Sequence, residues 1–281
     1  MADAARSAAR RVEASPLVRA LARGGYAAGG AVHVLIGLLV LTLAFGVSGE
    51  ADQSGALRAI AGAPLGLAVL WIIAVLLWAL ALYHLIEAFV LRGGGATEKT
   101  AALKTALTTA LTTWGRRISE AGQAVVFAAL GAVAASVALG ARTEGNRSAE
   151  DASRGVLALP GGDIVLGLVG LGVAAGGVAF VVMGVMRSFE KKMSIPKDGV
   201  GPFVTTLGVV GYIAKGVALA IVGVLLVVAA VTSDASQAGG LDDAFDTLHG
   251  LFLGPVLVGL VGAGFVAYGL FLFFRARYAR L

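Results

Sequence analysis

The stretch that decides the fold of this 281-residue chain is GYAAGGAVHVLIG, residues 25–37. The pattern returns as GYIAKGVALAIVG at residues 211–223, and a more divergent copy, SEAGQAVVFAALG, occupies residues 119–131. Each copy lies in a long apolar run, so the chain is read as three related units in tandem. These copies indicate an architecture. They contain few ionisable side chains and indicate no particular reaction.

The composition favours a membrane protein. Hydrophobic residues make up 58% of the chain and charged residues 14%, and the mean hydropathy is +0.89. A soluble domain of this length cannot bury so much apolar surface. Cysteine is absent, which excludes disulfides, thiolate metal sites and cysteine nucleophiles.

The apolar runs are long enough to cross a bilayer, which takes about 20 helical residues. We therefore expect an all-α integral membrane protein with six spans, at about residues 23–46, 64–91, 118–140, 163–186, 203–231 and 250–274. Taken in pairs, the spans give repeats at 23–91, 118–187 and 203–274. The remaining parts are read as a basic N-terminal segment, an amphipathic interfacial segment and a basic C-terminal tail, at 1–22, 92–117 and 275–281.

The positions of lysine and arginine predict the orientation. In the six-span model, 18 of the 22 basic residues fall on one side, and basic loops stay in the cytoplasm. We expect both termini to be cytoplasmic and the chain to be a multi-pass protein of the bacterial inner (plasma) membrane. Nucleic acid is not expected as a partner. Membrane lipids are, including anionic headgroups at the cytoplasmic face, and a membrane-protein partner or a second copy of the chain is left open.

Glycines recur at matching places in the first span of each repeat. Small residues let membrane helices approach closely, and a step of seven residues keeps two positions on nearly one helix face. The repeats run in the same direction, so we expect a pseudo-threefold bundle in which the first spans pack on one another. The expected packing residues are Gly30, Gly37, Gly131, Gly216 and Gly223.

The second spans also correspond. Each follows a step that contains proline, at Pro64, Pro160 or Pro255. Alignment of their charged ends predicts that Leu80, Phe180 and Tyr268 occupy one column of the repeat.

These patterns resemble a known family. The opening Gly211-Tyr212, followed by Ala214-Lys215-Gly216, together with the proline step and the glycine-rich second helix, is similar to the actinobacterial membrane family catalogued as domain of unknown function 1206. The resemblance covers essentially the whole chain and implies three tandem two-helix repeats in a membrane. The first copy departs with Gly29 at the basic position, and the second lacks the Gly-Tyr pair. The family brings no established activity.

Ionisable side chains within spans are the candidate site residues, because charge is costly there. They are His33, His84, Glu87, Glu120 and Lys215. Helix geometry puts the two histidines at similar depth, and Glu87 on the same face as His84. Four interpretations stay open: a polar vestibule for protons, an ion or a substrate; a divalent metal held by His33, His84 and Glu87; a b-type haem between the two histidines; or internal partners such as Lys215 with Glu120. No cofactor is expected.

Enzyme signatures such as GxSxG, HExxH and the P-loop are missing from the sequence. An enzyme is therefore not expected, although an unrecognised lipid-modifying activity is left open. The expected function is a membrane scaffold, accessory or lipid- or partner-binding module. The alternative is a small transporter or proton- or ion-conducting protein that uses the polar residues above.

Overall fold

The computed structural model describes residues 16–46, 51–90, 103–141, 145–196 and 199–280. This part of the chain is helical and contains no strand, only an isolated bridge between Met193 and Ala279. Most of the basic segment expected at 1–22 and the first part of the segment expected at 92–117 lie outside the described residues.

Six long helices are long and apolar enough to cross a membrane. This confirms the expected all-α architecture with six spans. The helices are α2 (Pro16–Ala44), α4 (Gly66–Val90), α5 (Leu103–Ala138), α7 (Gly162–Val185), α8 (Gly201–Thr232) and α10 (Gly254–Tyr278).

Helix α5 is longer than its span. It runs for 36 residues without a break, about 54 Å at the usual rise per residue. The described part of the expected interfacial segment, from Leu103 onward, is therefore continuous with the third span.

Each repeat also contains a short helix between its two spans. These helices are α3 (Gln53–Ala61), α6 (Gly145–Leu157) and α9 (Leu241–His249). A tight turn then leads into the second span, at Gly66, Gly162 and Gly254. At each of these glycines an added Cβ would collide with the carbonyl oxygen of the residue six or five positions earlier: Ile60, Val156 and His249.

The two ends of the bundle differ in charge. The end where α2 begins and α10 ends, called the basic end, also holds the 3₁₀ helix η2 (Ser188–Lys192). The backbone N–H of Ser194 donates to the Tyr278 carbonyl at 2.8 Å and thereby attaches the segment after η2 to the end of α10. The opposite, acidic end carries α3, α6, α9 and the 3₁₀ helix η3 (Ala235–Gln237).

The core changes character between these ends. Toward the acidic end it is mainly aliphatic, with buried Ile36, Val40, Leu70 and Val258 beside Phe245 and Phe265. Toward the basic end it is aromatic, and its buried rings include Tyr26, Tyr83, Phe189, Tyr212, Tyr268 and Phe271.

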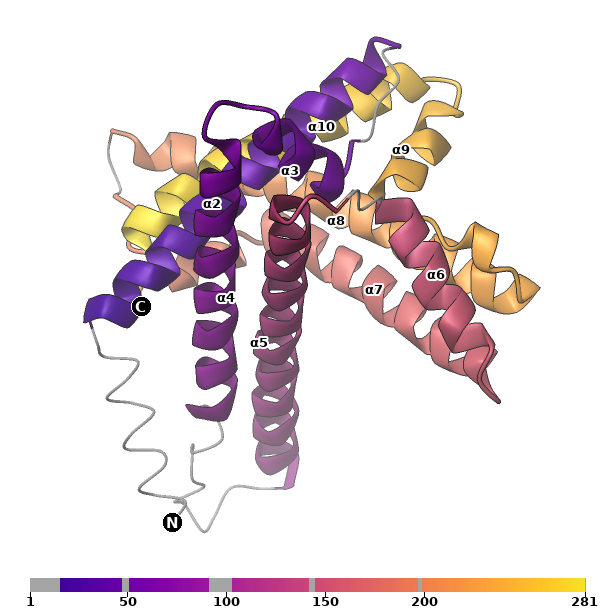
Figure 1. The fold of residues 1–281 in the computed structure, drawn as a ribbon. Helices are drawn as coiled ribbons and strands as arrows, with labels where there is room; N and C mark the ends of the chain where they lie inside the picture. Colours follow the sequence, from indigo (N-terminus) through magenta and orange to yellow (C-terminus); the bar gives the residue numbers. More distant parts are fainter. Residues whose placement is uncertain (1–15, 47–50, 91–102, 142–144, 197–198, 281) are drawn as a thin grey trace.

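The most extensive helix contacts join neighbouring repeats: α2 with α10, α4 with α5, and α7 with α8 (Figure 1). In each pair the first span of one repeat packs on the second span of the preceding repeat, with the third repeat preceding the first. The expectation that the first spans pack on one another is wrong, because α2, α5 and α8 share no extended contact among the described residues. The ring is also open, since α5 and α7 share none either.

Close contacts fix how the second spans correspond. An added Cβ at Gly37 would meet Val266, at Gly131 it would meet Trp78, and at Gly223 it would meet Ala174. These three partners therefore share one column, and six residues further on another column holds His84, Phe180 and Leu272. The alignment from the charged ends was thus wrong by one turn in the second repeat. There Gly176, and not Phe180, matches Leu80 and Tyr268.

Candidate functional site

A buried polar group that we call the His84 cluster joins α4, α5 and η2. His84 Nδ1 lies 2.8 Å from Glu120 Oε2, and the Lys192 ammonium donates to Glu120 Oε1 at 2.7 Å. His84 and Glu120 are 1% and 0% exposed, whereas Lys192 is 44% exposed. The cluster thus lies inside the bundle and reaches its surface at the basic end through the lysine.

Glu87 completes this cluster. It lies three residues after His84 on α4, so the two side chains share one helix face. Ligand atoms of His84, Glu87 and Glu120 all lie within 4.8 Å of one another. These three of the five candidate residues are therefore brought together.

Aromatic rings enclose the imidazole of His84. It stacks on Phe127, with ring centroids 5.4 Å apart and an interplanar angle of 11°. The edges of Tyr26 and Tyr83 approach it at 6.2 and 5.6 Å. Its Nδ1–H donates to Glu120, and among the described residues its buried Nε2 has no hydrogen-bond partner. A buried polar atom of this kind is uncommon in native structures.

The other two candidate residues form a separate His33 cluster. The Lys215 ammonium donates to His33 Nε2 at 3.1 Å, and His33 Nδ1 lies 2.7 Å from the Gly29 carbonyl oxygen. These roles assign the imidazole proton to Nδ1. The ammonium also lies 4.6 Å from the ring centroid of Tyr268 and 5.4 Å from that of Phe180, a cation–π arrangement that stabilises a sheltered cation.

A buried arginine lies between the two clusters. The Arg275 guanidinium lies 4.6 Å over the Tyr26 ring and donates to the Tyr212 hydroxyl at 3.3 Å. Tyr26 contacts His84, and Tyr212 contacts Tyr268. The links through these tyrosines are ring contacts, so the residues described do not form one hydrogen-bonded chain from His33 to Lys192.

The sequence interpretation had placed these partners differently. Lys215 pairs with His33, not with Glu120, and no ring contact joins His33 and His84 in the described part of the chain. The two histidines thus belong to different clusters, each with its own partners. Lys192 was not recognised, because a lysine in a basic loop has no sequence signal that separates it from a topology determinant.

All five candidate packing glycines lie in contacts between repeats. Each lies in the first span of its repeat and packs against the second span of another repeat. Gly30 approaches the backbone of Gly269, and Gly37 approaches the backbone of Gly262, both on α10. Gly216 meets Gly177 in the same way on α7. The remaining contacts are those of Gly131 with Trp78 and of Gly223 with Ala174.

A cavity of about 540 Å³ opens at the basic end, between η2, the start of α8 and the end of α10. Two exposed arginines, Arg187 and Arg280, line it. Glu190 is also in the wall, where it accepts a hydrogen bond from the Thr205 hydroxyl at 3.0 Å. Arg280 Nε donates to the Ser194 hydroxyl at 3.0 Å. The cavity therefore presents cationic donors beside hydroxyl groups.

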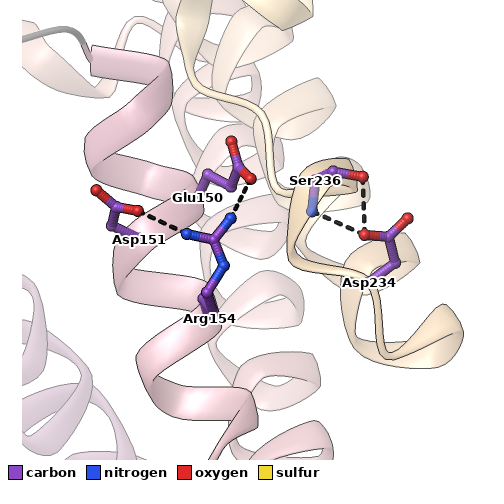
Figure 2. Close-up of polar contacts among 5 residues, drawn as sticks. All are labelled: Glu150, Asp151, Arg154, Asp234 and Ser236. Atoms are coloured by element: carbon purple, nitrogen blue, oxygen red, sulfur yellow. Dashed lines mark hydrogen bonds and ion pairs between the residues drawn. The ribbon is translucent and has the colours of Figure 1, made fainter.

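A second cavity of about 520 Å³ lies at the acidic end, between α6 and η3. Figure 2 shows that Arg154 points back to Glu150 and Asp151 on its own helix. Asp234 accepts from the backbone N–H and the hydroxyl of Ser236 at 3.0 and 2.7 Å. The charged side chains drawn here thus have partners within their own elements, so we do not regard this cavity as the site.

The acidic end also holds a partly buried link between the first and third repeats. The Ala51 backbone N–H donates to Asp242 Oδ1 at 2.6 Å, while Asp52 caps α3 by accepting from Gly55 N–H at 2.8 Å. Burial, reinforced by the nearby Asp52 carboxylate, raises the pKa of Asp242 to about 7. Burial also raises the pKa of Asp52.

Comparisons with known proteins agree with this threefold organisation. The chain is 25% identical over 271 residues to "Uncharacterized protein YxxB" of Bacillus subtilis (strain 168), covering 96% of this chain and 94% of the relative. Because that relative comes from Bacillus, the actinobacterial restriction expected above is not supported. No solved structure matches. The family model described as Domain of Unknown Function (DUF1206) matches three times, at residues 24–91, 118–187 and 210–279, and the chain belongs to that family.

Proposed function

We propose that this protein is a non-enzymatic module of the bacterial inner membrane that binds anionic lipid headgroups at its basic end, on the cytoplasmic side. The observation that carries the proposal is the basic-end cavity with Arg187 and Arg280 in its wall. Guanidinium groups pair well with phosphate oxygens. The cavity volume of about 540 Å³ leaves room for a headgroup.

The distribution of polar groups supports binding over transport. Both histidine clusters lie in the aromatic half of the core, next to the basic end. The other half, among the described residues, is packed with aliphatic side chains such as Val40 and Leu70. An ion pathway would need polar lining through both halves, so the transporter remains the second candidate.

Lipid retention tests the proposal. The purified protein would be mixed with phosphatidylglycerol or phosphatidylcholine in detergent, and retained lipid would be measured by native mass spectrometry. We expect preference for phosphatidylglycerol, reduced about tenfold or more in Arg187→Gln/Arg280→Gln, since each arginine near anionic lipid contributes about 1 kcal/mol. Arg154→Gln at the acidic end is the matched control. Equal retention of both lipids would contradict the proposal.

Flux through liposomes tests the alternative. Proton and cation leak would be compared for empty vesicles, the wild type, His33→Ala and His84→Ala. We expect all four rates to agree. A leak that is carried by the wild type and lost in a histidine variant would favour transport.

A further inference from the structure

The His84 cluster lies where the repeat elsewhere places an aromatic pair. Glu120 corresponds to Tyr26 and Tyr212 in the three motif copies, and His84 shares its column with Phe180 and Leu272. At the α7–α8 interface the equivalent residues, Phe180 and Tyr212, stack with centroids 5.4 Å apart. Stacked rings therefore suffice to hold these helices together, and the fold itself does not require a histidine and a glutamate at the α4–α5 interface.

The groups that replace the rings form a ligand set for a metal ion. His84, Glu87 and Glu120 each offer one ligand atom, and these atoms lie within 4.8 Å of one another. Neutral imidazole and carboxylate are ligands that Zn²⁺ accepts. Two residues come from α4 and one from the adjacent α5, so two packed helices hold the set in place.

Two further observations point to a cation at this place. A positive charge already lies there, because the Lys192 ammonium is 2.7 Å from Glu120 Oε1. In addition, His84 Nε2 is buried without a partner among the described residues, a costly state that shows that the imidazole lacks its second partner. Because Lys192 is 44% exposed, its side chain has solvent to move into.

We propose that His84, Glu87 and Glu120 bind a divalent cation of the Zn²⁺ type, and that the Lys192 ammonium takes the place of this cation when it is absent. Binding then displaces the lysine toward solvent and leaves the two carboxylates to neutralise the metal. This proposal does not depend on lipid binding at the basic-end cavity, which uses other residues.

Zinc titration of the full chain in detergent, after removal of metal with a chelator, tests the proposal. Binding would be followed by calorimetry and its stoichiometry by elemental analysis. We expect about one tightly held Zn²⁺ per chain. His84→Phe, which keeps an aromatic ring as in the second repeat, should weaken binding about 10- to 100-fold. Lys192→Met should strengthen binding about tenfold, since it removes the competing ammonium.

Two controls keep the outcome interpretable. His249→Ala removes the exposed histidine beside the acidic-end aspartates and should leave the affinity unchanged. The double variant His84→Phe/Glu120→Tyr reproduces the aromatic pair of the α7–α8 interface, so it should remain monodisperse and bind no Zn²⁺ at this site. Absence of saturable binding in both the wild type and Lys192→Met would overturn the proposal. So would unchanged affinity in His84→Phe, or binding that depends on His249.

Discussion

The α4–α5 interface carries a buried, hydrogen-bonded polar pair at the height where the α7–α8 interface carries two stacked rings. His84 and Glu120 meet at 2.8 Å in the first, and Phe180 and Tyr212 stack in the second. The two interfaces also differ six residues away on the second span. Gly223 approaches the backbone of Ala174 on α7, whereas Gly131 faces the indole of Trp78 on α4.

The comparison separates what the fold needs from what it tolerates. Both helix pairs are built on the same columns of the repeat, so a close approach and a filled volume are the shared requirement. Burial of a carboxylate and its polar partner costs desolvation that their own attraction often does not repay, and the cost is greater within a membrane. The polar pair is therefore better explained by a role in binding than by a role in stability.

The largest expected effect comes from a substitution that pushes α7 and α8 apart. A Cβ at Gly177 would meet Gly216 O and Ala220 N, which are backbone atoms that cannot move independently of their helix. Gly177→Val should therefore lower the free energy of unfolding by about 3 kcal/mol, measured by denaturation in detergent. At Gly176, the next residue, an added Cβ meets nothing within 4 Å. Gly176→Val should thus have little effect, and equal losses in the two variants would show that close packing does not hold this interface.

A second, smaller effect is expected from breaking the polar pair. Glu120→Leu removes the partner of both His84 and Lys192. The lysine regains water, but the imidazole loses its one hydrogen bond among the described residues. We expect a loss of about 2 kcal/mol. His84→Phe/Glu120→Tyr should recover most of it by restoring an aromatic pair. If the double variant were less stable than Glu120→Leu, the two interfaces would not be interchangeable.

The sequence predicted the repeat and the spans but not the helix partners. Apolar length and the positions of lysine and arginine are local properties, so the six spans followed from them. Gly30 could pack on another first span or on Gly269 of α10. Which of the two it contacts depends on shape complementarity between distant segments, and a single sequence does not reveal this. The one-turn error at Phe180 arose because the charged ends of the second spans do not lie at equivalent heights.

The candidate residues could be found because their position within an apolar run is a local property of the sequence. Their grouping could not be predicted, because it depends on contacts between distant segments. A histidine or glutamate inside an apolar run is visible in one sequence, whereas its partner is not. Lys192 reaches Glu120 from 72 positions away, and Lys215 reaches His33 from 182. Helix periodicity relates residues three or four positions apart, so it predicts neither of these pairings.

The junction of the third and first repeats extends the comparison, because its polar link lies at the acidic end. The pKa of Asp242 is raised from 3.8 to about 7 by burial and by Asp52, so the folded protein holds this proton more tightly than the unfolded chain does. Its contribution to stability is greatest in acid and is lost as the pH rises from about 4 to about 7. Asp242→Asn keeps the acceptor for Ala51 N–H without the charge. At pH 8 it should raise stability by about 1 kcal/mol, allowing for solvent screening.

Thermal unfolding of Asp242→Asn and the wild type between pH 5 and pH 8 measures this difference. We expect the two curves to converge toward acid and to separate progressively as the pH rises to about 7, with a weaker pH dependence in the variant. Some dependence should persist, since burial also raises the pKa of Asp52 and of Asp243. Asp234→Asn is the control, because hydrogen bonds from Ser236 lower the pKa of that exposed carboxyl. A gain in Asp234→Asn equal to that in Asp242→Asn would mean that net charge, and not the buried link, sets the response.

The smallest expected effect comes from an exposed charged contact that lies within a single helix, α6. Arg154 bonds Glu150 and Asp151 on its own helix (Figure 2), and 62% of its side chain is exposed. Exposed pairs of this kind contribute about 0.5 kcal/mol or less, and salt screens them. Arg154→Ala should therefore change stability by about that amount, and the change should vanish in high salt. Because the His84–Glu120 contact is buried between two helices, Glu120→Leu should keep most of its effect in the same salt; equal sensitivity of the two variants would place that pair in contact with solvent.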